Sequence, residues 1–474
     1  MRTISACCAP VHAGMRGGFW FHWRFAADAR PRNRRPPFSG SPSVEKLVSL
    51  CKRKGFIFQS SGIYGGINGC WDFGPLGVEL KRNLKNDWWY RFVQTRDDMV
   101  GLDASIITHP EVWVASGHVE NFHDMLVDCK DCRKRFRQDH LETEKCPECG
   151  GELTEPKAFN SMLRTRLGVS DDSSVETYLR PETCQSIFVD FKDVYSSTRV
   201  KIPFGIAQIG KSFRNEVNPR NFIFRSREFE QMEIEYFCRE EDEERLFDQW
   251  QKDIWSWYLG LGIKESHLRW YEHPKESLAH YSKRTVDVEY EFPFGWGELQ
   301  GLANRGTFDL NAHSKHSGKD LSFFDAEKNE RFVPTVLEPS AGADRTTLAV
   351  LCDAYDEEDV GGETRVVMRF APKLAPIKAA ILPLVKKDGL AELADGLEKK
   401  LRRKFNTYYD HAGAIGRRYR RQDEIGTPYC VCVDFDTKEN GTVTVRDRDS
   451  MEQVRVHMDE LAAYIEKRVS FDQE

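Results

Sequence analysis

The segment 213–233 constrains the fold more than any other, because arginines and carboxylates stand among apolar residues on both sides of an Asn-Pro pair. The pattern predicts a strand, a tight turn and a second strand. Arg214 and Glu216 are two residues apart and are expected on one face of the first strand, and Phe229 and Glu233 on one face of the second. We therefore predict a hairpin that presents arginines, carboxylates and an aromatic ring to one site.

Such a hairpin suits a nucleoside triphosphate bound beside a small cationic substrate. Guanidinium groups hold phosphate through paired hydrogen bonds, an aromatic ring can stack on a base, and carboxylates hold Mg²⁺ or an ammonium group. A charged hairpin exposed to solvent is the alternative. It would not need Met232, Ile234 and Tyr236 among the charges, because large apolar side chains are usually buried.

The same region contains a second phosphate-binding pattern, which we reject. Residues 205–212 fit the letters of the P-loop, which requires a glycine-rich turn followed by a helix. Here the interior of the pattern is apolar and strand-like, and Pro219 lies where that helix should run.

Length and charge limit the remaining classes. A chain of 474 residues predicts two or three domains, and no apolar stretch approaches the roughly 20 residues that a membrane span needs. The net charge of −6 does not indicate a nucleic-acid partner, so local basic patches must support any such interaction.

Residues 1–42 differ in composition from the rest, with seven arginines, one acidic residue and no lysine. We expect a disordered basic extension of a cytoplasmic protein. A targeting peptide is the alternative, because transit peptides share this composition. Translation from an early start would also produce such an extension, since Met15 lies within it.

Four cysteines form two Cys-x-x-Cys pairs in an insert expected at 126–155. They are Cys129, Cys132, Cys146 and Cys149. Four thiolates at this spacing predict a closed structural Zn²⁺ site, with free or redox-active cysteines as the alternative. The other cysteines are expected in the core of a protein from a reducing compartment.

Two further segments supply candidate elements of the site. A stripe of apolar residues at i+4 spacing predicts a helix over 76–92, which follows Pro75, and the run 99–107 predicts a strand. A glycine-bearing strand end before Asp344 predicts a helix whose first turn carries Arg345. An arginine at a helix N-terminus would meet the oxygens of a triphosphate.

These residues resemble the three motifs of the class II aminoacyl-tRNA synthetases. Motif 2 of that family has the form Arg-x-Glu, a loop, then Arg-x-x-x-Phe, and Arg214, Glu216, Arg225 and Phe229 match it. The surrounding residues are similar to those of the dimeric glycyl-tRNA synthetases, and the resemblance runs from about Val44 to the C-terminus.

The resemblance implies an α+β fold. Its parts would be a class II antiparallel sheet flanked by helices over 43–360, a zinc-ribbon-like insert at 126–155 and a C-terminal α/β anticodon-binding domain over 370–474. It also implies a homodimer formed through the motif 1 helix around Pro75.

The periodicity after residue 374 supports an α/β domain. It predicts strands over 377–385, 429–435 and 442–446, and helices over 390–405, 415–423 and 451–469. Residues 353–363 are expected to form a linker, and the segment after Thr183 a strand. The basic runs 399–404 and 417–421 have the charge density that an RNA backbone attracts, although exposed helix faces without a ligand are the alternative.

The family activity implied by this resemblance is ATP-dependent formation of glycyl-adenylate, followed by transfer of glycine to the 3′ end of tRNA(Gly). The cofactors would be ATP with Mg²⁺ and a structural Zn²⁺. By resemblance, Arg214, Arg225 and Arg345 would be the catalytic residues, which hold the phosphates of a bent ATP. Phe229 would stack on adenine, with Glu216 at the adenine edge.

Other positions follow from the same resemblance. Glu298 and Glu338 would hold Mg²⁺, and Arg96, Glu182, Glu233 and Ser340 would bind the amino acid. The complete ATP-binding set would be Arg214, Asn215, Glu216, Phe224, Arg225, Ser226, Arg227, Glu228, Phe229, Glu298, Leu299, Gly342, Ala343, Asp344 and Arg345. The glycine-binding set would be Arg96, Glu182, Phe229, Glu230, Gln231, Met232, Glu233, Glu338, Pro339, Ser340, Ala341 and Gly342.

Two other functions are open to a chain with these motifs. One is a class II synthetase for serine, threonine or proline, which amino-acid-dependent pyrophosphate exchange would distinguish. The other is a synthetase-like nucleic-acid-binding module, such as the accessory subunit of the mitochondrial DNA polymerase. Relatives of that kind lose the ATP-binding arginines, whereas Arg214, Arg225 and Arg345 are present here.

Overall fold

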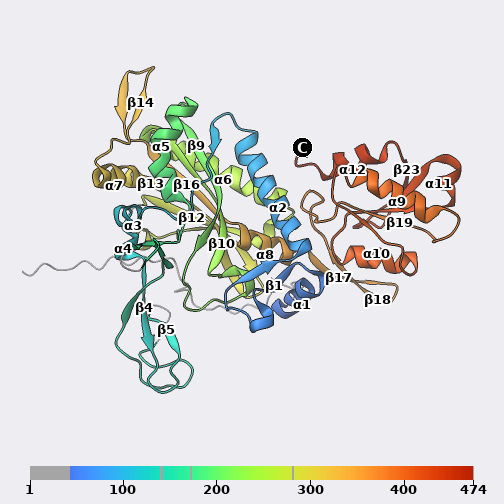
Figure 1. Ribbon diagram of the computed structural model, residues 1–474, viewed down its shortest axis with the longest axis horizontal. Coiled ribbons are helices and arrows are strands. Elements are labelled where there is room, and N and C mark those ends of the chain that lie inside the picture. Colours follow the sequence, from blue (N-terminus) through green and yellow to red (C-terminus); the bar gives the residue numbers. More distant parts are fainter. Residues whose placement is uncertain (1–42, 139–140, 142, 171–172, 280–281, 473–474) are drawn as a thin grey trace, which may run out of the picture.

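The computed structural model describes residues 43–138, 141, 143–170, 173–279 and 282–472. The expected N-terminal extension, residues 1–42, lies outside the described residues. The described part has two main hydrophobic cores, one around a seven-stranded sheet and one around a five-stranded C-terminal sheet (Figure 1). No helix in the described part is both long and apolar enough to cross a lipid bilayer.

The larger sheet is antiparallel except at one edge, where β3 runs parallel to β9. In spatial order its strands are β11 (Leu268–Glu272), β12 (Arg284–Phe292), β13 (Gly295–Gly306), β16 (Thr335–Gly342), β10 (Glu228–Cys238), β9 (Phe204–Phe213) and β3 (Met99–Gly101).

Side chains along β10 point alternately to the two faces of this sheet. Met232, Ile234 and Tyr236 belong to the main core, together with residues of four helices and of a π-helical turn, η2 (Tyr90–Gln94). These helices are α1 (Val44–Lys54), α2 (Pro75–Trp89), α6 (Glu243–Gly260) and α8 (Ala343–Ala354). Phe237 instead joins a smaller cluster with α5 (Cys184–Thr198) and α7 (Phe308–Ser317). Residues with the same parity as Glu233 therefore face away from the main core.

Helix α2 confirms the helix predicted from the apolar stripe. Pro75 occupies its first turn, where the missing amide hydrogen costs no hydrogen bond, and Leu80, Leu84 and Trp88 are buried. Its last turn continues into η2, which buries Phe92.

The cysteine-bearing insert projects from the body (Figure 1). It contains a three-stranded sheet in the order β5 (Arg135–Arg137), β4 (His123–Asp128) and β6 (Lys157–Asn160). The neighbouring elements are α3 (Pro110–Ala115), α4 (His118–Asn121), β7 (Arg164–Leu167) and β8 (Val175–Tyr178). Two smaller hairpins pair β1 (Ile57–Gln59) with β2 (Trp71–Phe73) and β14 (Phe323–Asp325) with β15 (Glu330–Phe332).

The C-terminal sheet has strand order β20 (Thr407–Tyr409), β19 (Ala379–Pro383), β21 (Tyr429–Val433), β22 (Thr442–Asp447) and β23 (Gln453–His457). Its helices are α9 (Leu390–Leu401), α10 (Ile415–Asp423), α11 (Phe435–Asn440) and α12 (Leu461–Val469). A hairpin of β17 (Tyr355–Val360) and β18 (Glu363–Met368) precedes it.

Several predicted elements were wrong. Strand β9 ends at Phe213, so Arg214 and Glu216 lie in a loop and share no strand face. The strand expected over 99–107 ends at Gly101, and the segment after Thr183 is helix α5, whose apolar residues recur at helical spacing. Residues 353–363 contribute to a hairpin instead of a linker.

The remaining differences between the predicted and observed elements lie in the C-terminal part. The helix expected over 451–469 is strand β23 followed by the shorter α12, because the alternation in Gln453–His457 favours a strand. Strand β20 and helix α11 were not predicted. The rejected P-loop pattern lies within β9, as expected for a strand.

A buried charge cluster joins the β17–β18 hairpin to the C-terminal sheet. Asp423 is fully buried, and its carboxylate accepts hydrogen bonds from Arg365 Nε at 2.8 Å and Arg446 Nη1 at 3.0 Å. Arg365 also donates to the backbone oxygen of Arg448 at 2.5 Å. Removing one charge from such a cluster leaves the others buried without compensation.

We expect Asp423→Asn to destabilise the C-terminal sheet by about 3–5 kcal/mol, the usual cost of breaking a buried ion pair. Native-state hydrogen exchange of amides in β21 and β22 would measure the loss. Lys399→Ala is the matched control, since the ion pair between Lys399 and Asp395 is exposed and should contribute little. Equal protection of these amides from exchange in Asp423→Asn and Lys399→Ala would contradict the prediction.

Candidate active site

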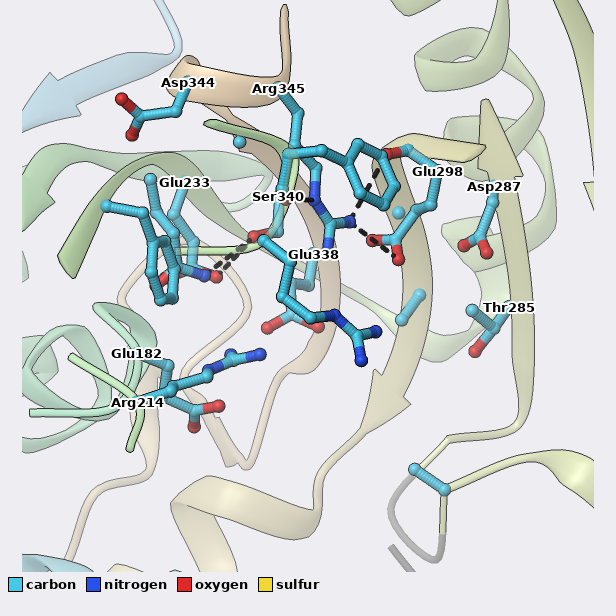
Figure 2. Close-up of a pocket in the computed structure, with 18 of the residues that line it drawn as sticks. Glu182, Arg214, Glu233, Thr285, Asp287, Glu298, Glu338, Ser340, Asp344 and Arg345 are labelled. Carbon is cyan, nitrogen blue, oxygen red and sulfur yellow. Dashed lines mark hydrogen bonds and ion pairs between the residues drawn. The ribbon is translucent and has the colours of Figure 1, made fainter. Parts of the chain in front are cut away.

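A cavity of about 220 Å³ opens on the face of the large sheet away from the main core. Strands β10, β13 and β16, the loop between β9 and β10, and the first turn of α8 supply its walls. Figure 2 shows Arg345 reaching toward Glu298 on one side, with Glu182, Glu233 and Ser340 grouped on the other. The cavity therefore has a cationic wall beside an acidic one.

The loop after β9 places two arginines in the cavity wall. The Nε of Arg214 donates to the backbone oxygen of Pro181 at 3.0 Å, and its guanidinium lies 5.2 Å from the Phe229 ring centroid. Burial lowers the pKa of Arg225, and the positive charge of Arg345 lowers it further, although Glu216 acts in the opposite direction. The cations here exceed the nearby anions, as is expected of an anion-binding wall.

Arg345 extends from the first turn of α8, as the sequence predicted. Its Nε donates to Phe224 O at 3.2 Å, and its Nη1 lies 3.1 Å from Glu298 Oε2. The guanidinium also stacks 4.6 Å from the centroid of the Phe224 ring.

The acidic wall is a network around Glu233. Ser340 Oγ donates to Glu233 Oε1 at 2.7 Å, and Thr183 donates to the other carboxylate oxygen. Glu182 lies beside it and pairs with His118 Nε2 at 3.1 Å. These contacts fix the carboxylates before any ligand binds.

Sequence reasoning missed Arg305, which lies at the end of β13 and is 3% exposed. Its Nη1 donates to Glu338 Oε1 at 2.8 Å, and its Nε and Nη2 bond Asp309 at 2.7 and 2.8 Å. An arginine near the end of a predicted strand, with an acid four residues later, was the available signal.

The local charges set distinct protonation states. Burial would raise the pKa of Glu182, but His118 and Arg305 more than offset this and hold it well below its usual range. Burial and the charge of Glu182 raise the pKa of Glu233. Burial raises the pKa of Glu338 to about 8 despite Arg305.

Glu235 lies under this acidic wall and is fully buried. Its carboxylate is close to those of Glu233 and Glu338 and to the Cys184 thiol, with the four ligand atoms within 4.8 Å of one another. Among the described residues, neither oxygen has a hydrogen-bond partner. Burial and the charge of Glu338 raise the pKa of Glu235 well above its usual range, so we expect it to be protonated at neutral pH.

Sixteen of the proposed substrate-binding residues line the cavity. They are Glu182, Arg214, Glu216, Phe224, Arg225, Ser226, Phe229, Glu230, Gln231, Glu233, Glu298, Glu338, Ser340, Gly342, Asp344 and Arg345. The carboxylates of Glu230 and Asp344 are already paired with Lys81. Lining residues that were not predicted include His273, Thr285, Asp287 and Arg305.

Other proposed positions do not line the cavity. Arg96 is paired with Asp98 at 2.7 Å and with Asp253 at 3.3 Å, so the structure does not bring it to the acidic wall. Met232 belongs to the main core because its parity in β10 places it on the opposite face from Glu233. The remaining residues outside the lining are Asn215, Arg227, Glu228, Leu299, Pro339, Ala341 and Ala343.

The four predicted metal ligands come together in the insert. Cys129 Sγ lies 3.5 Å from Cys149 Sγ, and Cys132 Sγ lies 3.7 Å from Cys146 Sγ. Backbone amides also point at sulfur, with Cys132 N 3.5 Å from Cys129 Sγ. Four convergent thiols fit a tetrahedral metal such as Zn²⁺.

Residues of the predicted basic runs in the C-terminal part differ in burial. Arg418 is buried and donates to the backbone oxygens of Pro383 and Leu384, so its role is structural. Arg417, Lys400 and Arg403 are exposed and could meet an anionic partner.

Comparison with known proteins identifies first the class and then the family. Residues 378–468 match the family model described as an anticodon binding domain, which makes this chain one of the proteins that carry that module. Curated proteins from Treponema denticola, Streptomyces coelicolor and Thermobifida fusca, each named glycine–tRNA ligase, are 54%, 53% and 54% identical to it. The alignments cover 90%, 90% and 91% of this chain and 97%, 98% and 99% of those proteins. The chain therefore belongs to the glycine–tRNA ligase family.

We expect Glu235→Gln to change the pH dependence of stability. Unfolded glutamate ionises near pH 4.3, whereas folded Glu235 retains its proton to much higher pH. Unfolding therefore releases a proton at neutral pH, and the parent loses stability relative to the glutamine variant as pH rises from about 5 to about 8. Thermal unfolding across this range measures the difference.

Glu439→Gln is the control, because Glu439 is exposed on α11. Its melting temperature should follow that of the parent at every pH. A constant offset between the parent and Glu235→Gln across the range would refute the protonated state of Glu235.

Proposed function

We propose that this protein activates glycine with ATP and transfers it to the 3′ end of tRNA(Gly). The observation that carries the proposal is the cavity in which an arginine wall adjoins a carboxylate wall. One wall suits a triphosphate and the other an ammonium group, and glycyl-adenylate formation needs both side by side.

On the cationic side, Arg214 is proposed to bind the α-phosphate, and Arg225 and Arg345 the outer phosphates. Guanidinium groups fixed before reaction can stabilise the charge that develops on the phosphoryl oxygens. Phe229 lies at the same wall, where it could stack on adenine.

On the acidic side, Glu182, Glu233 and Ser340 are proposed to bind the glycine ammonium group. Glu182 is ionised, and Ser340 already donates to Glu233, so the group meets preorganised acceptors. A pocket built around the smallest amino acid can exclude larger ones by steric clash, without an editing site.

ATP is expected to enter with Mg²⁺, and the two proposed carboxylates fit that ion unequally. Glu298 lines the cavity beside Arg345, which suits an ion held near phosphate. Glu338 is bonded to Arg305, and its raised pKa opposes ionisation, so we assign it to the acidic network instead.

The reaction would have two steps. A carboxylate oxygen of glycine attacks the α-phosphorus of ATP, the bond to the β-phosphate bridge breaks, and pyrophosphate leaves. A ribose hydroxyl at the 3′ end of tRNA then attacks the carbonyl carbon of the mixed anhydride and releases AMP. Because no side chain is required as a nucleophile, positioning and charge stabilisation would dominate.

The domain division and assembly are part of this proposal. Residues 43–360 would form a class II synthetase core with a zinc-binding insert at 126–155, and residues 370–474 would bind the anticodon. A homodimer through α2 and a cytoplasmic location are proposed from family resemblance.

Glycine-dependent ATP–pyrophosphate exchange tests the activity, and Glu233→Gln tests the pocket. We expect alanine and serine to support little exchange, and the variant to raise the KM for glycine by at least tenfold more than that for ATP. Charged hydrogen-bond partners typically contribute about 1.5–3 kcal/mol, which corresponds to such a ratio. Ready exchange with alanine, or equal effects on both substrates, would contradict the assignment.

We also expect one Zn²⁺ per chain at Cys129, Cys132, Cys146 and Cys149, with Zn–S distances near 2.3 Å. Metal analysis of protein purified without chelator, together with X-ray absorption spectroscopy, would measure both. Cys146→Ser should lose the metal and expose the insert to protease. Cys352→Ser, a buried cysteine of α8, is the control and should retain the metal. A metal-free parent would exclude the zinc site.

A further inference from the structure

Lys81 is a buried cation that joins three elements beside the cavity. It lies on α2 and is 9% exposed. Its Nζ is 2.8 Å from Asp344 Oδ1 on α8 and 2.6 Å from Glu230 Oε2 on β10. Burial would lower the pKa of the ammonium group, but the two carboxylates more than offset this, so the residue stays charged.

Asp344 completes the connection through its other carboxylate oxygen. Its Oδ2 accepts a hydrogen bond from the backbone amide of Glu230 at 2.7 Å. Lys81 and Asp344 therefore fasten the first turn of α8 to β10. This arrangement leaves the Asp344 carboxylate engaged with protein groups and directs it away from the neighbouring Arg345 (Figure 2).

Arg345 depends on this helix start for its position. Its own contacts are to Phe224 O at 3.2 Å, Glu298 O at 3.3 Å and the Glu298 carboxylate at 3.1 Å. The Lys81–Asp344 ion pair is shorter and more buried than the Arg345–Glu298 ion pair. Asp344 immediately precedes Arg345 in the sequence. The Lys81–Asp344 pair therefore fixes the backbone of the turn from which the Arg345 guanidinium extends, in addition to the direct contacts of that guanidinium.

We propose that Lys81 is a positioning residue for the ATP half of the reaction. By holding Asp344 against β10, it fixes the helix turn from which Arg345 meets the triphosphate. Lys81 does not line the cavity, so it acts through Asp344 and not through substrate. The inference rests on the proposed function, because it assigns phosphate to Arg345.

The glycine wall is held by separate contacts. Ser340 and Thr183 fix Glu233, and His118 fixes Glu182. Loss of Lys81 should therefore affect ATP much more than glycine. A residue that only supports the fold would weaken both substrates together and lower the melting temperature.

Lys85 supplies a matched control on the same helix. Its Nζ lies 2.7 Å from Glu230 Oε1, but among the contacts described for it none reaches Asp344. It is also more exposed than Lys81. Lys85→Met removes a lysine from the same carboxylate while leaving the connection to α8.

The test measures steady-state pyrophosphate exchange for Lys81→Met and Lys85→Met. A displacement of about 1 Å at a reacting group can reduce the rate by about 10²-fold. We expect Lys81→Met to lower kcat/KM for ATP by about 10–100-fold, with the KM for glycine within about threefold of the parent. Lys85→Met should stay within about threefold for both substrates. An unchanged ATP response in folded Lys81→Met, or equal losses for ATP and glycine, would overturn the proposal.

Asp344→Asn keeps the test decisive if Lys81→Met does not fold. The amide retains the shape and an acceptor for the Glu230 amide but removes the charge that holds Lys81. We expect this variant to show the same selective loss of kcat/KM for ATP. Kinetic constants equal to those of the parent would overturn the proposal.

ATP-induced stabilisation separates this inference from the proposed function. A ligand raises the melting temperature according to its affinity for the folded state. If the parent shows no glycine-dependent exchange, the proposed function fails. A shift with Mg-ATP that is present in the parent and in Lys85→Met but lost in Lys81→Met would still support the role of Lys81. Equal shifts in all three proteins would exclude it.

Discussion

The buried guanidinium of Arg305 is the contact on which the acidic side of the cavity depends. It donates hydrogen bonds to Glu338 and Asp309 where almost no solvent reaches, at distances of 2.7–2.8 Å. Its positive charge lowers the pKa values of Glu182, Glu233, Glu235 and Glu338, which lie close together. Burial nevertheless raises the pKa values of the last three. An arriving ammonium group would therefore meet negative charge at Glu182, the one of these four whose pKa lies below its usual range.

The cationic side is organised differently, from the first turn of α8. Consecutive side chains leave this turn in different directions, with Asp344 anchoring it and Arg345 extending into the cavity (Figure 2). The same turn thus carries both the residue that fixes the helix start and the residue that extends into the cavity. Arg345 and Glu233 are in this way held by different contacts, which is why a change at the start of α8 is expected to leave Glu233 largely in place.

Local signals in the sequence predicted the parts that depend on nearby residues. The apolar stripe and Pro75 located α2, the paired cysteines converge in the structure, and the glycine-bearing strand end located the start of α8. The mixed fold with antiparallel strands was also predicted. The loop after Phe213 was not, because Arg214 and Glu216 keep the two-residue spacing of a strand past the last residue that pairs with β10. Helix α5 was taken for a strand from its β-branched and aromatic residues, although its apolar positions recur at helical spacing.

Contacts between distant segments were beyond sequence reasoning. Lys81 and Asp344 are 263 residues apart, and each is unremarkable within its own helix. The same holds for His118 with Glu182, and for Arg305 with Glu338, which lie on the neighbouring strands β13 and β16. Arg96 is the opposite case. It matches the family pattern in the sequence, but in the structure it pairs with Asp98 and Asp253 and does not line the cavity.

The alternation along β10 has a consequence for how this chain can change in length. Strand β10 is buried on both sides, with Met232 in the main core and Glu233 at the cavity. Inserting or deleting one residue within it would exchange these environments for every following position, placing acids in the core and apolar side chains at the ligand. The loop 214–227 has an isolated bridge between Arg220 and Arg225 but no continuous strand pairing, so it carries no such alternation. Variation in length between related chains should therefore be confined to the loop, and β10 should keep its residue count.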